Sequence, residues 1–189
     1  MHEVAVPNAF KITICGIEEL VEHSDRQVTH VLSILDPGAP EPEAFGRFGE
    51  HERLVLRFHD VIEEHVRGYD SPQPQHVEAL LEFGQTLIGR SDAHLLIHCH
   101  MGISRSTAAA TLLLAEANPD RSAAEVMREV ARIRSKAWPN LRMIEIGDAM
   151  LGRNGELVRV VRNRHHELAR ALPHVADLMR NSGRGRELG

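Results

Sequence analysis

The stretch HLLIHCHMGISRST, residues 94–107, carries the strongest indication of how this chain folds. It opens with an apolar run typical of a buried strand and passes through a short loop that contains one glycine. Three alanines follow at 108–110, so the chain continues into a helix. The sequence therefore predicts a strand, a loop and a helix in direct succession.

The same alternation extends outward from this stretch. Apolar, β-rich runs at 11–15, 28–35 and 54–58 precede it. Helical periodicity covers 76–88, 105–116, 141–151 and 156–171, and Ser122 with Glu125 forms a capping box that opens another helix through Ile133. This order predicts an α/β fold with a central, mostly parallel sheet of about four to five strands flanked by helices. We expect one domain over residues 1–180 and a disordered tail at 181–189.

The composition limits the cellular compartment and the classes of partner that are expected. The chain has 189 residues, 42% of them hydrophobic, and two cysteines, Cys15 and Cys99, so a disulfide framework is excluded and a reducing cytoplasm is expected. Residues 1–20 lack a leader pattern, and no apolar run is long enough to cross a bilayer. Residues 1–98 carry 17 acidic and 7 basic side chains, which disfavours nucleic acid or an anionic membrane as a partner.

The spacing of Cys99 and Arg105 indicates an anion site. A loop of this length, here called the anion loop (residues 99–105), can turn its backbone N–H groups inward at the positive end of the following helix. Gly102 allows the backbone to approach a ligand closely, and Arg105 offers a planar fork to two oxygens of one anion. The helix end and the guanidinium also favour the thiolate form of Cys99. The loop therefore predicts a nucleophilic sulfur beside a bound phosphate.

Five residues, His98, Cys99, Gly102, Arg105 and Ser106, together resemble the signature loop of the protein tyrosine and dual-specificity phosphatase superfamily, in a compact bacterial-type form. The resemblance implies that Cys99 forms a phosphocysteine, that Arg105 binds the phosphoryl group and that Ser106 helps the thiolate to leave. It implies no metal and no other cofactor. The loop residues that would surround the phosphate are His100, Met101, Gly102, Ile103 and Ser104.

The resemblance also implies an aspartate that acts as general acid on an earlier loop. Asp60 is the preferred candidate because it directly follows the run at 54–58, which looks like the strand that leads to the acid in this superfamily. Asp70 is the alternative, although it reads more simply as a turn residue before Ser71 and Pro72. Two residues are expected to support the loop without touching the substrate: His98, which would orient Cys99, and Asn140, at the start of a helix.

The expected substrates are phosphorylated proteins or small phosphate esters: phosphotyrosine first, with phosphoserine and phosphothreonine also open. Ile103 occupies a position where lipid-directed relatives often carry lysine, which disfavours a lipid phosphate. A phosphate-dependent binding module with negligible turnover is the alternative class. Sulfur-transfer and arsenate-reducing enzymes have related cysteine loops, but the loop length and the position of Cys99 well inside the chain fit them poorly.

The histidines and the second cysteine allow simpler interpretations. The histidines His94, His98 and His100 beside Cys99 could indicate a metal site, but that site would leave Gly102 without a role, and the guanidinium nearby would repel a cation. Cys15 is expected to be structural, with a disulfide to Cys99 under oxidation as the less favoured possibility.

Overall fold

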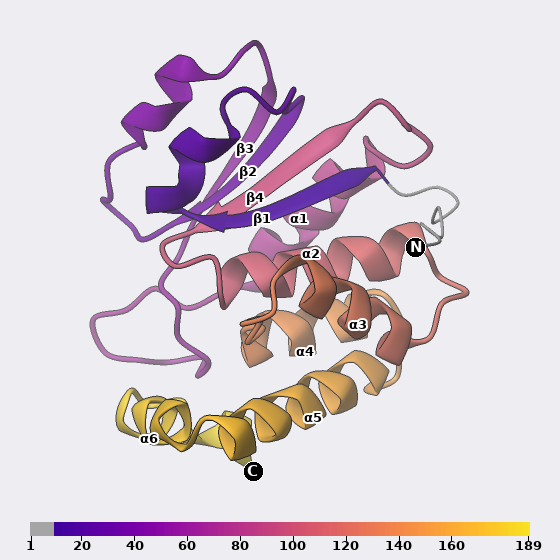
Figure 1. Cartoon of the computed structure of the whole chain (residues 1–189). Helices are drawn as coiled ribbons and strands as arrows, with labels where there is room; N and C mark the ends of the chain where they lie inside the picture. Colours follow the sequence, from indigo (N-terminus) through magenta and orange to yellow (C-terminus); the bar gives the residue numbers. More distant parts are fainter. Residues whose placement is uncertain (1–9) are drawn as a thin grey trace.

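The computed structural model describes residues 10–189. Within them four strands form one sheet in the order β1-β4-β2-β3, and every neighbouring pair is parallel (Figure 1). This confirms the predicted α/β class with a parallel sheet, and each strand lies within a few residues of its predicted run. The strands are β1 (Lys11–Gly16), β2 (His30–Leu35), β3 (Glu52–Arg57) and β4 (His94–Cys99).

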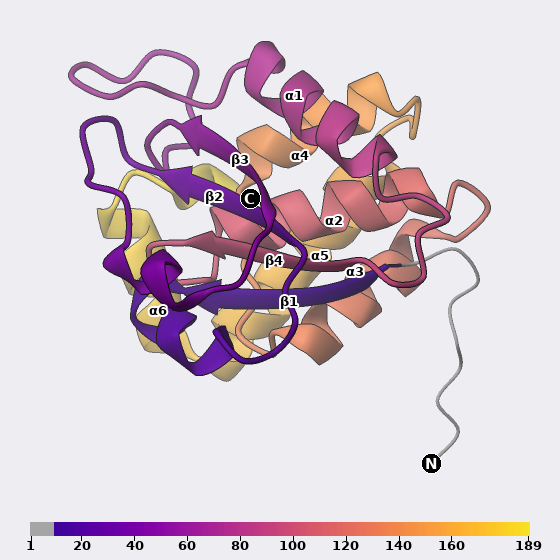
Figure 2. The same ribbon diagram turned by 90° about the horizontal axis from the view of Figure 1, so that it is seen from above.

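Helices cover one face of this sheet and short 3-10 turns cover the other (Figures 1 and 2). The helices are α1 (Pro74–Gln85), α2 (Arg105–Ala117), α3 (Ala123–Ile133), α4 (Leu141–Met150), α5 (Glu156–Ala171) and α6 (Pro173–Asn181). The 3-10 turns η1 (Ile17–His23) and η2 (Glu43–Arg47) lie on the second face, and η3 (Gly185–Leu188) follows α6. The predicted capping box is present, since the Glu125 amide donates to Ser122 Oγ at 3.3 Å.

Helix α2 is central to the helical layer, and eight of its thirteen residues are alanine, serine or threonine. All but one of its residues are buried, and its alanines, serine and threonines let it lie close to the sheet while α1, α3 and α4 pack around it. The helix begins directly after the anion loop, so this loop is held between the sheet and the most buried helix of the fold.

The parallel arrangement brings four chain segments to one edge of the sheet. The carboxyl ends of β1, β2, β3 and β4 all lie at this edge, where ligands bind in open parallel sheets. The residues that follow these ends are Ile17, Asp36, Phe58 and His100. Groups that are distant in the sequence therefore meet beside the anion loop.

The two cysteines lie on opposite faces of the sheet. Cys99 belongs to the apolar cluster under the helices, whereas Cys15 belongs to a second cluster with Leu20, Val31 and Leu96 under the 3-10 turns. Both thiols are free, and burial raises the pKa of Cys15 to about 12. Its thiol is therefore neutral at ordinary pH, in agreement with a structural role and not with a reactive one.

The end of the chain differs from the disordered tail expected at 181–189. Residue 181 completes α6, η3 follows, and both Arg184 and Glu187 are buried. The tail was expected to be disordered because it lies at the terminus, but two opposite charges in it pair with each other inside the protein, which removes the main obstacle to burying them.

Among residues 10–189, no helix is both long enough and apolar enough to cross a membrane. The sequence also predicted that residues 1–20 carry no leader; the first nine of these lie outside the described residues.

Candidate active site

The backbone of the anion loop is held by its carbonyl groups. Each of the five carbonyls from residue 100 to residue 104 accepts a hydrogen bond from the surrounding protein, whereas no amide of residues 101–105 donates one to any residue in 10–189. In a trans peptide the N–H points away from the C=O, so outward carbonyls leave these five amides facing the opposite side, at the N-terminus of α2. The bonds are Ile17 N to His100 O (3.0 Å), Arg134 Nη2 to Met101 O (3.0 Å), Arg134 Nε to Gly102 O (3.1 Å), Trp138 N to Ile103 O (2.9 Å) and Ala108 N to Ser104 O (2.9 Å).

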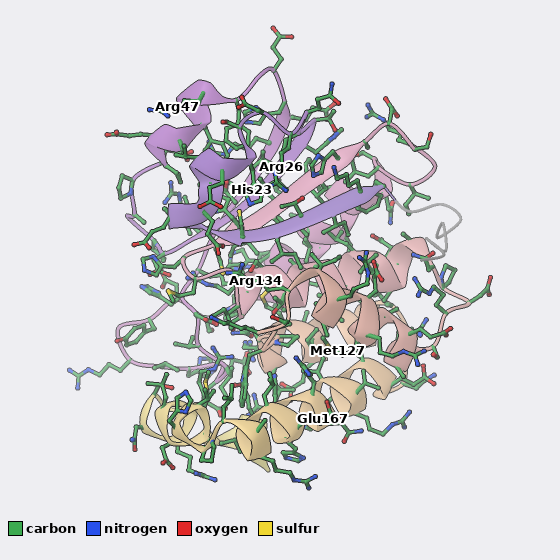
Figure 3. The ribbon with its side chains drawn as sticks, viewed as in Figure 1. His23, Arg26, Arg47, Met127, Arg134 and Glu167 are labelled. Carbon is green, nitrogen blue, oxygen red and sulfur yellow. The ribbon has the colours of Figure 1, made fainter. Side chains whose placement is uncertain are left out.

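Arg134 is a supporting residue that the sequence did not reveal. It follows α3, pairs with Glu19 of η1 at 2.9 Å, and uses two of its nitrogens on the carbonyls of Met101 and Gly102. Figure 3 shows Arg134 between β1 and the helices below it. One arginine therefore turns two peptide units of the loop, so that their amides are available to an anion.

Gly102 is required by both conformation and space. Its φ is +68°, and a Cβ at this position would lie 2.6 Å from the carbonyl oxygen of Cys15 and 2.6 Å from the amide nitrogen of Gly16. The loop thus packs directly on the backbone of β1, and a side chain on residue 102 would separate the two.

We expect Gly102→Ala to destabilise the protein more than Gly89→Ala. Gly89 also has a positive φ, +81°, but has open space around it, so alanine there costs only the left-handed conformation, about 1–2 kcal/mol. Alanine at 102 adds overlap with β1, about 1–3 kcal/mol more. Urea unfolding of both variants measures the difference, and equal losses would contradict the close packing of the loop.

Cys99 ends β4 at the base of this loop. The residue is 2% exposed, and its Sγ lies 3.2 Å from Ser106 Oγ in the first turn of α2. A hydroxyl at this distance can donate to a thiolate. The structure thus brings together the sulfur and the hydroxyl that the sequence pointed to.

Arg105 lies in the interior and not in solvent. It is 3% exposed, and its Nη1 donates to Asp36 Oδ1 and to the carbonyl of Phe58, both at 2.6 Å. Its Nε is buried and donates to no residue within 10–189. A buried donor without an acceptor is costly, and an anion bound by the loop amides would supply one. Asp36 was missed from the sequence, although its place directly after a buried strand is a usable signal.

Asp60 reaches the anion loop through one oxygen. Its Oδ1 accepts from Ser104 Oγ (2.7 Å) and from Asn140 Nδ2 (2.8 Å), and pairs with Arg184 Nη1 (3.1 Å). The side chain is 31% exposed. Burial raises the pKa of Asp60, but the charges of Arg184 and Arg105 outweigh it, with help from the two hydrogen bonds, and hold the pKa below its usual range. Without a ligand this carboxyl is therefore ionised at neutral pH.

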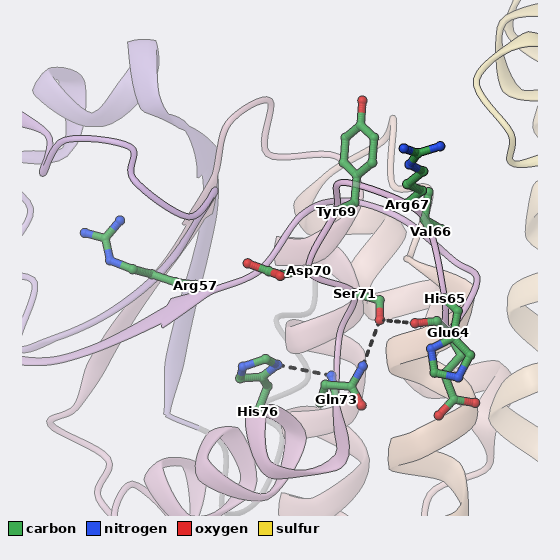
Figure 4. Close-up of a pocket in the computed structure, with 10 residues that line it drawn as sticks. All are labelled: Arg57, Glu64, His65, Val66, Arg67, Tyr69, Asp70, Ser71, Gln73 and His76. Atoms are coloured by element: carbon green, nitrogen blue, oxygen red, sulfur yellow. Dashed lines mark hydrogen bonds between the residues drawn. The ribbon is translucent and has the colours of Figure 1, made fainter.

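Asp70 lies elsewhere, in a cavity of about 720 Å³. Figure 4 shows Asp70 among the residues that line this cavity, together with Arg57, Tyr69 and His76. Of the two candidate acids, only Asp60 contacts the anion loop within the described residues.

Asn140 and His98 support the site in different ways. Asn140 caps α4 by accepting the Met143 amide at 3.1 Å, and it donates to Asp60 and to the carbonyl of Val61. The His98 ring lies on the face of the 3-10 turns, with Nε2 2.7 Å from Ser33 Oγ. Burial, together with the charge of Arg53, lowers the pKa of His98 to about 4. His98 is therefore neutral, and its Nε2 is hydrogen-bonded to Ser33 of β2.

The other loop side chains form the outer surface of the site. His100 and Met101 are exposed, Ile103 is half-buried, and Ser104 is buried beneath them. Residues 10–189 contain no group of three or more histidine, cysteine or acidic side chains placed to hold a metal ion.

No protein-family model matches this chain, and no curated protein matches it in sequence. Solved structures do match it. A mouse putative dual specificity phosphatase, solved with zinc tungstate, is 17% identical with a TM-score of 0.57, covering 85% of this chain and 96% of its own. Human DUSP28 is 17% identical with a TM-score of 0.56 and coverages of 77% and 96%. PTP-2 phosphatase of Cydia pomonella is also 17% identical, with a TM-score of 0.57 and coverages of 76% and 90%. This chain therefore has the fold of the dual-specificity and protein tyrosine phosphatases, as its sequence predicted.

Proposed function

We propose that this protein is a cysteine-dependent phosphatase that hydrolyses phosphate monoesters through a phosphocysteine intermediate. One observation carries the proposal: five amides and the Nε of Arg105, all without a partner among residues 10–189, belong to the same short loop as the sulfur of Cys99. These donors match the oxygens of a tetrahedral dianion. The fold shared with known phosphatases supports the proposal.

In the first step the Cys99 thiolate attacks phosphorus and the bond to the ester oxygen breaks. The leaving oxygen takes a proton from Asp60, and Arg105 with the loop amides holds the three other phosphate oxygens. Asp60 is ionised before substrate binds, so the dianion itself must favour its protonation, because a second negative charge nearby raises the pKa of a carboxyl.

In the second step a water molecule attacks the phosphocysteine. Asp60, now a carboxylate, accepts the proton of this water, and the sulfur–phosphorus bond breaks as inorganic phosphate forms. Ser106 Oγ donates to the departing thiolate from its position 3.2 Å away. The acid of the first step is thus the base of the second.

Phosphotyrosine in proteins is the proposed main substrate, with phosphoserine and phosphothreonine as further substrates. The half-buried Ile103 contributes no positive charge to bind a second phosphate, which favours a phosphoprotein over a phosphoinositide. The nearby exposed side chains, His100 and Met101, present a mixed surface suited to a peptide.

Phosphate release should be measured on a panel of phosphotyrosine peptide, phosphoserine peptide, phosphoinositide and nucleotide monophosphate. We expect the phosphotyrosine peptide to be the best substrate, and acid quenching during its turnover to trap a phosphate on the peptide that contains Cys99. If the protein binds phosphopeptide without releasing phosphate, it is a binding module and the proposal is wrong.

The choice between the two aspartates has its own prediction. Asp60→Ala should lower kcat for phenyl phosphate about 10²-fold or more, because phenolate is a poor leaving group and needs the proton. It should lower kcat for p-nitrophenyl phosphate less, since nitrophenolate leaves more easily. Asp70→Ala is the matched control and should leave both rates near those of the wild type. The opposite pattern would assign the acid to Asp70.

A further inference from the structure

The end of the chain buries two charged side chains. Arg184 is 7% exposed and Glu187 is 0% exposed. Arg184 donates from Nε and Nη2 to the two carboxylate oxygens of Glu187, at 2.8 and 2.7 Å. Burial of a charge is costly unless the charge is paired and hydrogen-bonded. The bidentate pair therefore explains why this charged segment can lie in the interior.

Glu187 anchors this pair to the segment that supports the anion loop. Its carboxylate accepts from the indole Nε1 of Trp138 at 2.6 Å and from the amide of Leu141 at 3.1 Å. Leu141 is the first residue of α4, so its amide has no partner within that helix. The amide of Trp138 binds the carbonyl of Ile103. The Arg184 guanidinium is thus fixed beside the loop.

The third nitrogen of Arg184 reaches the proposed acid. Nη1 donates to Ser104 Oγ at 2.9 Å and lies 3.1 Å from Asp60 Oδ1. Ser104 and Asn140 donate to the same oxygen, whereas no residue within 10–189 donates to Oδ2. Three donors therefore hold the carboxyl by one oxygen, and the other oxygen is left to carry a transferable proton.

Arg186 adds a second connection between the same segment and the residues after Asp60. It donates to the carbonyl of Ile62 at 2.6 Å, pairs with Glu63 at 3.0 Å, and also pairs with Glu145 of α4. The chain end thus contacts the acid and the two residues that follow Val61, and joins them to the helical layer.

We propose that residues 184–187 position the general acid, with Arg184 holding Asp60 by Oδ1 against Ser104 of the anion loop and leaving Oδ2 to exchange the proton. This role rests on the proposed phosphatase function, because it matters only if Asp60 protonates a leaving group. Arg184 is a positioning residue, since it acts on the substrate only through Asp60.

The surrounding charges give this role a measurable consequence. The cations that face Asp60 are Arg184, from the chain end, and Arg105, from α2; Glu187 and Asp36 lie behind them as their counter-charges. Burial lowers the pKa of Arg184, but the charges of Asp60 and Glu187 raise it by more. The pKa of Arg184 is therefore above its usual value, and this side chain stays charged. Loss of that charge raises the pKa of Asp60. Because the acid acts only when protonated, the decline of kcat with rising pH then moves to higher pH.

Arg184→Gln tests the role, with Arg180→Gln as the control. Arg180 is an exposed residue of α6, and Asp177 is its one ion-pair partner within the part of the chain that the structure describes. We expect Arg184→Gln to lower kcat for phenyl phosphate about tenfold or more and kcat for p-nitrophenyl phosphate less than about threefold, and to move the alkaline decline to higher pH. Arg180→Gln should match the wild type. A purely structural loss would lower both rates equally and leave the pH profile in place, which would overturn the role.

A second variant tests the role even if Arg184→Gln does not fold. That single change could prevent folding, since it leaves Glu187 buried without its cation. The double variant Arg184→Gln, Glu187→Gln removes both charges, and it should show the same dependence on the leaving group and the same shift of the pH profile. A double variant with the wild-type profile would overturn the role while the phosphatase function stands. A wild-type protein that releases no phosphate would instead reject the proposed function and this role with it.

Discussion

Replacing Cys99 by serine should lower phosphate release from p-nitrophenyl phosphate by a factor on the order of 10⁴ or more, because Cys99 carries the only thiol of the anion loop. The hydroxyl is a far weaker nucleophile than a thiolate at neutral pH. The anion loop itself should keep its conformation, since its carbonyls and Arg105 are held by partners other than the sulfur. Inorganic phosphate should therefore still bind to the variant in isothermal titration calorimetry.

Cys15→Ala is the control for this experiment. Cys15 is equally buried but lies on the other face of the sheet, so its loss should lower the melting temperature slightly and leave turnover intact. Substantial phosphate release by Cys99→Ser would exclude a phosphocysteine. Loss of phosphate binding together with turnover would show that serine disrupts the loop and would contradict the independent support of its backbone.

The second large effect is expected for Arg105→Lys. Lysine retains the charge but loses both the planar fork and the buried Nε, so it cannot bind Asp36, the carbonyl of Phe58 and a phosphate in the same geometry. We expect kcat/KM for an aryl phosphate to fall about 10²- to 10³-fold, the usual effect of losing one donor to the transition state. The affinity for inorganic phosphate should fall as well.

Asp36→Asn tests how much of the role of Arg105 depends on its ion pair with Asp36 and how much on binding the anion. Asparagine retains an oxygen acceptor for Nη1, and the carbonyl of Phe58 still holds the same nitrogen, so we expect a loss of only about tenfold or less. Steady-state kinetics and phosphate titration of both variants measure the contrast. If Arg105→Lys were as active as Asp36→Asn, the Nε of Arg105 would have no special role in binding the anion.

Much of the fold was predictable because its signals are local. Apolar runs and helical periodicity located all four strands and α1 to α5, and the pair Ser122 and Glu125 marked the start of α3. Each of these features depends on residues within a few positions of one another. The expectation of a disordered tail at 181–189 rested on its position at the terminus, and the sequence alone does not show that Arg184 and Glu187 find partners in the interior.

The candidate site likewise combines residues that are close in the sequence with residues that are distant in it. The residues of the anion loop are contiguous, so the spacing of Cys99, Gly102, Arg105 and Ser106 was enough to place a sulfur, a tight turn, a guanidinium and a hydroxyl in one loop. The groups that hold this loop are not contiguous. Asp36 is 69 positions from Arg105, and Arg184 is 80 positions from Ser104.

The sequence by itself therefore determined the parallel α/β architecture and the chemical groups of the anion loop, since both are encoded over short distances along the chain. Only the tertiary structure decided that Asp60 and not Asp70 lies against the anion loop. It also decided that Arg134 binds carbonyls of this loop, and that Arg184 at the end of the chain pairs with Asp60. The physical reason is that the strands are parallel: their carboxyl ends, and the polar groups that follow them, meet only when the whole sheet has formed.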